Sequence, residues 1–243
     1  MLSNFRRFAS KTLLIKEQQM FMKEATAFVN EKSDILNYLI NCEFMYKFKL
    51  PFNRDNGDRT FCTAYRAIHG KEFKPSCGSI LLNDTLEMQE IETLAAINKF
   101  RNALFGIPFS GSMGGIGINP TVFSEKELNS IMQLYVQDLS DKDYIGAYTD
   151  VISVEAISSE QIRNSIIDSV ILFNPNEKYK YASVLGKPIE RKGIAGSEVN
   201  RDLGLVNAVN HIINNVELCK SYNIYPGMRN RKVFICVFYL LGI

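Results

Sequence analysis

The sequence has few of the residues that bind metal ions or form disulfides. Five cysteines are scattered along 243 residues without a close pair, and the two histidines, His69 and His211, lie far apart in the chain. An odd number of widely spaced cysteines is typical of reduced thiols in an intracellular compartment. The sequence therefore predicts neither a disulfide framework nor a metal site.

Long runs of like charge and long apolar runs are also absent. No five consecutive residues carry the same charge, and the net charge is only +2, so no direct contact with nucleic acid is predicted. The apolar run near the C-terminus, Val233 to Leu241, is shorter than the roughly 20 residues that span a bilayer. We therefore expect no transmembrane segment.

Hydrophobic residues make up 46% of the chain, enough for a sizeable core. Helical spacing of apolar residues predicts helices over residues 12–30 and 34–42, and alternation predicts a hairpin with strands over 44–50 and 61–69. Asn56-Gly57 is its expected tight point. Later helices are expected to begin near Asp84, Ser124 and Ser158, and a last one to cover 199–219. Because strands and helices alternate, the predicted class is α/β.

Three of those helix starts carry a pattern typical of a capping box, in which a short polar residue is followed three positions later by an acid or amide. The pairs are Asp84 with Glu87, Ser124 with Glu127, and Ser158 with Gln161.

Residues 107–116, Ile-Pro-Phe-Ser-Gly-Ser-Met-Gly-Gly-Ile, form a glycine-rich stretch that we interpret as a loop between two apolar segments. Glycine lets a backbone bend sharply and approach a ligand closely, so the stretch has the character of an active-site loop. Its central side chain is Met113, a thioether that neither titrates at neutral pH nor donates a hydrogen bond. The stretch therefore resembles an active site that lacks its chemical group.

From about Met20 onward the sequence resembles glutamate dehydrogenase, over the substrate-binding and oligomerisation domain of that family. The blocks that carry the resemblance are Tyr65-Arg66-Ala67-x-His69, residues 107–120, Ser124-Glu125-x-Glu127-Leu128, and Gly186-Lys187-Pro188-Ile189-x-x-x-Gly193-Ile194-x-Gly196. The resemblance implies a mixed sheet flanked by helices over residues 17–232.

The resemblance also assigns site positions, and most of them are altered here. Met113 stands where the family has its catalytic lysine, and Cys77 stands in place of the first lysine that binds the substrate carboxylate. Arg101 replaces the second such lysine and keeps its charge, with a different geometry. Glu155 replaces the catalytic aspartate. The expected catalytic set is therefore degenerate, and Arg101 is the remaining candidate for binding an anion, although an ion pair within the fold is the expected role.

Residues 233–243 align with the first strand of the family's dinucleotide-binding domain. No G-x-G-x-x-G follows, so we expect no Rossmann domain and no cofactor in this chain. A strand without its sheet exposes backbone and apolar groups, and we expect another polypeptide to cover residues 233–243. The family's oligomer surfaces also allow self-association.

Residues 1–16 contain Arg6, Arg7, Lys11 and Lys16 and no acid, which is typical of a mitochondrial targeting segment. Together these features predict a catalytically inactive relative of glutamate dehydrogenase that acts as an accessory subunit of a mitochondrial assembly, such as a respiratory, ATP synthase or ribosomal complex. One alternative is a sensor that binds glutamate or another dicarboxylate through Arg101. Another is an active dehydrogenase completed by a second chain.

Overall fold

A computed structural model of the chain describes residues 11–29, 33–155, 157, 159–229 and 232. Most of the predicted targeting segment and the whole predicted strand at 233–243 lie outside these residues. The described chain divides into two compact units, one ending at Leu185 and one beginning at Gly186. Each unit is described separately below.

The first unit is built on a seven-stranded mixed sheet. Its strand order is β1-β2-β5-β3-β6-β7, with β4 pairing to a second stretch of β5. The hairpin pair β1 and β2 is antiparallel, as is β2 with β5, whereas the other pairings are parallel. The strands are β1 Phe44–Asn53, β2 Arg59–His69, β3 Ser76–Gly78, β4 Ile80–Leu82, β5 Ser110–Ile116, β6 Asp150–Ser153 and β7 Val184–Leu185.

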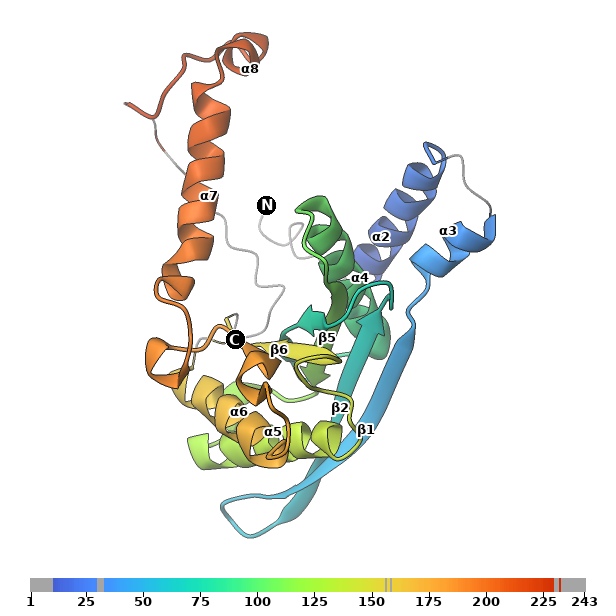
Figure 1. The fold of residues 1–243 in the computed structure, drawn as a ribbon, viewed down its shortest axis with the longest axis vertical. Helices are drawn as coiled ribbons and strands as arrows, with labels where there is room; N and C mark the ends of the chain where they lie inside the picture. Colours follow the sequence, from blue (N-terminus) through green and yellow to red (C-terminus); the bar gives the residue numbers. More distant parts are fainter. Residues whose placement is uncertain (1–10, 30–32, 156, 158, 230–231, 233–243) are drawn as a thin grey trace. The chain divides into compact units, whose positions relative to one another are not determined.

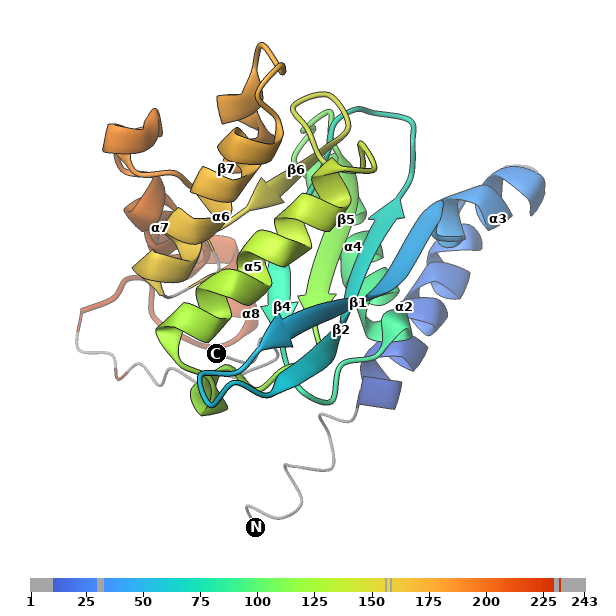
Figure 2. The ribbon, with the colours of Figure 1, turned by 90° about the horizontal axis from the view of Figure 1, so that it is seen from below.

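Helices cover both faces of this sheet, which confirms the α/β class and the flanked mixed sheet. α5 (Glu125–Ser140) and α6 (Glu160–Phe173) lie side by side over one face, while α4 (Met88–Leu104) and α2 (Lys11–Thr26) lie on the other (Figure 2). The larger apolar core fills the α5 and α6 side, and a smaller one fills the α4 side. The remaining helices of this unit are α3 Ser33–Ile40, η1 Pro120–Val122 and η2 Lys180–Ser183.

The predicted hairpin is confirmed. β1 alternates between buried side chains, such as Phe48, and exposed ones, such as Lys49, because one face of the strand packs on the core. Gly57 adopts a φ of +88° at the tight point of the turn, a conformation that glycine reaches without steric cost.

The glycine-rich stretch is not a loop, so that expectation is wrong. Residues 110–116 form β5, an entirely buried strand in the middle of the sheet. Glycine is needed there because neighbouring groups lie very close: a Cβ at Gly111 would be 2.2 Å from the Ala95 carbonyl oxygen of α4. A Cβ at Gly114 would be 2.3 Å from the Tyr135 hydroxyl on the opposite face. These glycines therefore serve helix packing on both sides of a strand.

The helix starts agree only in part with the predicted capping boxes. Ser124 and Glu127 form a complete box at the start of α5. The box at Asp84 is wrong, because α4 begins after Glu87, which makes no side-chain capping bond, and Asn83 instead accepts the Thr85 amide in a turn. At α6 the capping side chain belongs to Ser159, one residue later than predicted.

The second unit contains η3 (Ile189–Arg191), α7 (Ser197–Asn214) and α8 (Val216–Ser221), and Figure 1 shows α7 as a long helix that α8 follows. The single helix expected over 199–219 is interrupted at Asn215. This residue is extended, with φ −74° and ψ 107°, and its side chain accepts the Leu218 amide at 3.0 Å to cap α8. None of the helices in the described part of the chain is long and apolar enough to cross a membrane.

Candidate functional site

Cys77 lies in β3, between the two strands that flank it in the sheet. It is in register with Gly111 of β5 on one side and with Val151 of β6 on the other. The missing Gly111 side chain points toward α4, so Cys77 lies on the α4 face of the sheet. Glu155 is four residues after Val151 in the sequence. It is exposed and lies just beyond the end of β6.

Met113 is on the same face, one strand repeat from Gly111. It is only 5% exposed and packs in the smaller apolar core, whose members include Tyr65, Leu81 and Ile91. The only polar contact that its sulfur makes among the described residues is with the Asn98 amide, 4.0 Å away. A thioether in this setting fills space and cannot accept or release a proton.

Arg101 projects from α4 and is exposed. Its guanidinium donates to the Asn98 side-chain carbonyl, while the Asn98 amide donates to the backbone carbonyl of Ser112 at 2.8 Å. Among the residues that the structure describes, none forms an ion pair with Arg101. The ion pair expected for it is not found among these residues, where an amide anchored to β5 holds the cation instead.

The charges of two other predicted site residues act on the Cys77 thiol. Burial raises the pKa of the Cys77 thiol to about 12; Asp150 and Glu155 also raise it, while Arg66 and Arg101 oppose them. Charges influence a pKa in this way only at short range. The charges of Arg101 and Glu155 thus both act on Cys77, while burial keeps its thiol neutral.

A buried ionic cluster on the opposite face of the sheet was not predicted. Arg66 of β2 donates to Asp150 of β6 at 2.7 Å, and Ser112 of β5 donates to the same carboxylate at 2.6 Å. Burial lowers the Arg66 pKa, but Asp150 and Tyr135 together outweigh this effect and raise the pKa. Because these residues lie far apart in sequence, no local pattern indicates their contact.

Asn98 was not identified from the sequence either. Its position one helical turn before Arg101 is a signal that could have indicated their contact.

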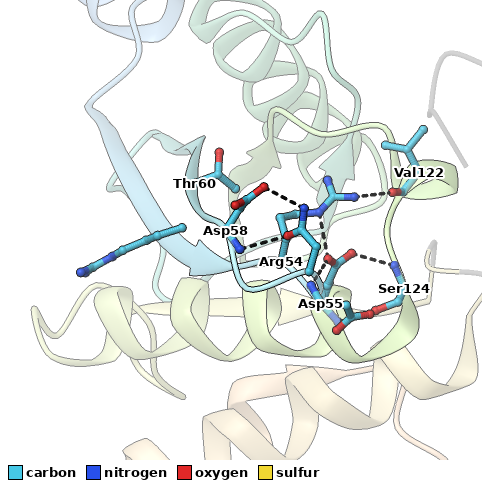
Figure 3. A pocket seen from close by; sticks show the side chains of 9 residues that line it. Arg54, Asp55, Asp58, Thr60, Val122 and Ser124 are labelled. Carbon is cyan, nitrogen blue, oxygen red and sulfur yellow. Dashed lines mark hydrogen bonds and ion pairs between the residues drawn. The ribbon is translucent and has the colours of Figure 1, made fainter.

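An open polar pocket of about 830 Å³ lies between the hairpin turn and the start of α5 (Figure 3). Arg54 donates to Glu127 at 2.8 Å and to the Val122 carbonyl, and its guanidinium lies 4.4 Å from the Phe123 ring centroid. Glu127 also accepts the backbone amides of Asp55 and Ser124. These groups satisfy one another, so the cluster fastens the hairpin to the helix.

Two further features bear on possible ligands. The described residues include no group of three or more His, Cys, Asp or Glu side chains that could hold a metal ion. Lys187, in the second unit, is mostly buried, and burial lowers its pKa. Its carbonyl oxygen would lie 1.7 Å from a Cβ at Gly193, so these residues form a tight turn.

The chain is similar to amino-acid dehydrogenases. The sequence model of the family described as "Glu/Leu/Phe/Val dehydrogenase, dimerisation domain" matches residues 43–171. The mitochondrial glutamate dehydrogenase of Dictyostelium discoideum is 28% identical over 215 residues, which are 88% of this chain and 43% of that protein. The glutamate dehydrogenase of Aeropyrum pernix is 23% identical over 192 residues, which are 76% of this chain and 45% of that protein.

Solved structures show the same fold. The hetero-hexameric glutamate dehydrogenase of Thermus thermophilus, in a leucine-bound form, gives a TM-score of 0.74 at 22% identity, over 87% of this chain and 48% of that one. The enzyme of Peptoniphilus asaccharolyticus gives 0.72 at 21% identity, over 88% of this chain and 51% of that one. The present chain thus spans about half the length, or less, of these relatives. By the family match over residues 43–171, the chain belongs to the Glu/Leu/Phe/Val dehydrogenase family, in the region of its dimerisation domain.

Proposed function

We propose that this protein has lost the dehydrogenase chemistry of its family and acts as a non-catalytic accessory subunit of a larger assembly. The observation that carries the proposal is Met113. It stands where the resemblance places the catalytic lysine, and its side chain, only 5% exposed, is packed in the smaller apolar core. General acid–base chemistry needs a group that exchanges a proton near the working pH, and a thioether has none.

The surroundings of Met113 support the same conclusion. Cys77 replaces a lysine, and its thiol stays neutral because burial raises its pKa to about 12. Arg101 is the cation that remains, and a guanidinium does not release a proton in proteins. None of Met113, Cys77, Arg101 and Glu155 carries an amine that could replace the family's catalytic lysine.

The test is an assay of the purified full-length protein, alone and in its native complex. NAD⁺ and NADP⁺ are each supplied with glutamate, leucine, phenylalanine or valine, and reduced cofactor is measured at 340 nm. We expect no turnover above the blank. Cofactor-dependent turnover that Met113→Ala or Cys77→Ala abolishes would overturn the proposal and favour an active dehydrogenase, completed where necessary by another chain.

The cellular setting is part of the proposal. The acid-free, basic composition of residues 1–16 and the mitochondrial relative in D. discoideum support a mitochondrial location. The family description as a dimerisation domain supports self-association. Fractionation of the source cells, followed by purification under mild detergent, tests both. We expect the protein in the mitochondrial fraction and in a particle larger than its own oligomer, such as a respiratory, ATP synthase or ribosomal complex.

One observation favours a second function, that of a glutamate or dicarboxylate sensor. Arg101 forms no ion pair with a described residue, and Asn98 holds it in one orientation. Calorimetry with glutamate and with 2-oxoglutarate separates the two functions. Binding at millimolar concentration or tighter, lost in Arg101→Ala, would favour the sensor; no heat of binding favours the accessory subunit.

A further inference from the structure

The C-terminal end of α4 carries a small exposed surface that the dehydrogenase comparison does not account for. Arg101 and Leu104 stand at positions i and i+3 of α4 and share one face of the helix, and Phe105 is the cap residue that follows Leu104. Leu104 is 81% exposed and Phe105 is 71% exposed. Two large apolar side chains therefore lie in solvent directly beside an exposed cation.

The backbone that presents this surface is fixed. The amides of Phe105 and Gly106 donate to the carbonyls of Arg101 and Ala103, and the Ile107 amide donates to the Asn102 carbonyl at 2.9 Å. Gly106 closes the helix with a φ of +65°, a common way for helices to end. The carbonyls of Arg101, Asn102 and Ala103 are thus satisfied within the turn, and the apolar side chains project from a hydrogen-bonded support.

The cation is fixed as well. The guanidinium of Arg101 donates to Asn98, and Asn98 is anchored to the Ser112 carbonyl of β5 at 2.8 Å. Within the described residues no carboxylate neutralises Arg101. A side chain that is already oriented loses less conformational entropy when it binds an anion, so the position is suited to recognition.

We propose that Arg101, Leu104 and Phe105 dock a segment of a partner polypeptide in which a carboxylate stands next to large apolar side chains. This inference rests on the proposed function, because it names the surface by which the accessory subunit contacts its assembly. The charge decides the occupant: Arg101 attracts a carboxylate, and Leu104 and Phe105 cover apolar groups beside it.

Other occupants fit the surface less well. A small dicarboxylate would satisfy Arg101 but leave Leu104 and Phe105 in water. A second copy of this chain, meeting the same surface about a twofold axis, would bring two Arg101 cations into one small interface, and neither Arg101, Leu104 nor Phe105 supplies a carboxylate to offset them. The partner segment is therefore on a different chain, with an acidic residue or a C-terminal carboxylate at its centre.

Site-specific photocrosslinking in the source cells tests this surface on the full chain. A benzoylphenylalanine replaces Phe105, and in a matched control it replaces Tyr148, which is 63% exposed in a separate loop. Mass spectrometry then maps the crosslinked residues. We expect one dominant product from position 105. Its crosslinked partner residue should lie within about two residues of a carboxylate and among apolar side chains. Adding Arg101→Gln should reduce its yield at least tenfold, and Arg101→Lys should restore part of it.

Four results would overturn the inference. These are a yield at position 105 no higher than at 148, a crosslinked segment without a nearby carboxylate, a yield unaffected by Arg101→Gln, and a crosslink to a second copy of this chain. Circular dichroism and thermal melting check that the Arg101 variants remain folded. If the crosslinking overturns this docking surface, the proposed loss of catalysis still stands, because that proposal depends on Met113 and on the activity assay. Measured dehydrogenase turnover would overturn the proposed function whatever the crosslinking shows.

Discussion

The guanidinium Nε of Arg66 donates to Oδ2 of Asp150 over 2.7 Å, and both side chains are 0% exposed. The two residues lie on β2 and β6, which are separated in the sheet by β5 and β3. Ser112 on β5 also joins the cluster, because its hydroxyl accepts from Arg66 at 3.0 Å and donates to Asp150. The pair thus connects strands that are not neighbours.

Removing one partner of this pair should be costly. In Asp150→Asn the Arg66 charge stays buried without a counterion, and breaking such a pair typically costs about 3–5 kcal/mol. Urea unfolding followed by circular dichroism measures the loss. The control is Glu43→Gln, which removes the exposed ion pair with Lys71 and should cost less than about 1 kcal/mol. Equal effects of the two variants would contradict the role given to burial.

Gly111→Ala should destabilise the protein by several kcal/mol, a size typical of overpacking against rigid neighbours. The new Cβ would lie 2.2 Å from the Ala95 carbonyl oxygen and 2.3 Å from the Lys99 amide nitrogen, so the backbone of α4 would have to move. Gly204→Ala is the matched control, because nothing lies within 4 Å of its Cβ position in α7. That change should stabilise the chain by about 0.5–1 kcal/mol. Thermal melting compares both variants with the native protein.

Glu127→Ala should cost about 1–2 kcal/mol, because it removes a helix cap and leaves the Arg54 guanidinium and the Asp55 amide without their acceptor. The same change at Glu125, an exposed residue in the first turn of α5, should cost a few tenths of a kcal/mol. Hydrogen exchange of the hairpin turn gives a second measurement, since it should accelerate only in Glu127→Ala.

Cys77 should react slowly with iodoacetamide. Its pKa is raised to about 12, so the reactive thiolate is a very small fraction at pH 8, and alkylation should be at least about 100-fold slower than for the same cysteine in urea-unfolded protein. Mass spectrometry of the Cys77 peptide follows the reaction. Comparable rates in the folded and unfolded chains would mean that the folded chain does not hold the thiol neutral.

His69 should make stability depend on mild acid. Burial, and secondarily the charge of Lys99, lower its pKa from 6.5 to about 4, while Glu72 opposes them. Between these two values the unfolded chain binds the proton and the folded chain does not, so the free energy of unfolding should fall as pH drops from about 6.5 to 4. The expected loss is about 3 kcal/mol. Above pH 7 the contribution of His69 to the free energy of unfolding should not change with pH. Urea titrations at pH 7.5, 6.5, 5.5 and 4.5 measure it, and His69→Gln should remove that part of the slope.

Local signals in the sequence were sufficient for some of the fold. The hairpin was predictable because β1 alternates and Asn56-Gly57 favours a tight turn, and the α5 start because Ser124 and Glu127 are three residues apart. Strand β5 was not predictable from local signals, because its glycines are required by close contacts with Ala95 and Tyr135 that are made only in the folded chain.

The candidate site shows the same limit. Residue identities and the family resemblance pointed to Cys77, Arg101, Met113 and Glu155, but not to what each side chain contacts. That Asn98 would hold Arg101 depends on how α4 lies against β5. The sequence did not predict the break at Asn215 either. An asparagine can continue a helix or cap the next one, and in the folded chain Asn215 is extended and caps α8.

The Arg66–Asp150 pair also bears on how the chain acquires its fold during synthesis. The two residues are 84 positions apart, and β5 and β3 lie between their strands. On the ribosome, the residues of the hairpin and of β5 are synthesised well before Asp150 emerges. Until Asp150 emerges, Arg66 lacks the carboxylate with which it is buried in the folded chain. We therefore expect the central sheet to close only after β6 has left the exit tunnel, which makes the partly synthesised chain the stage most dependent on chaperones.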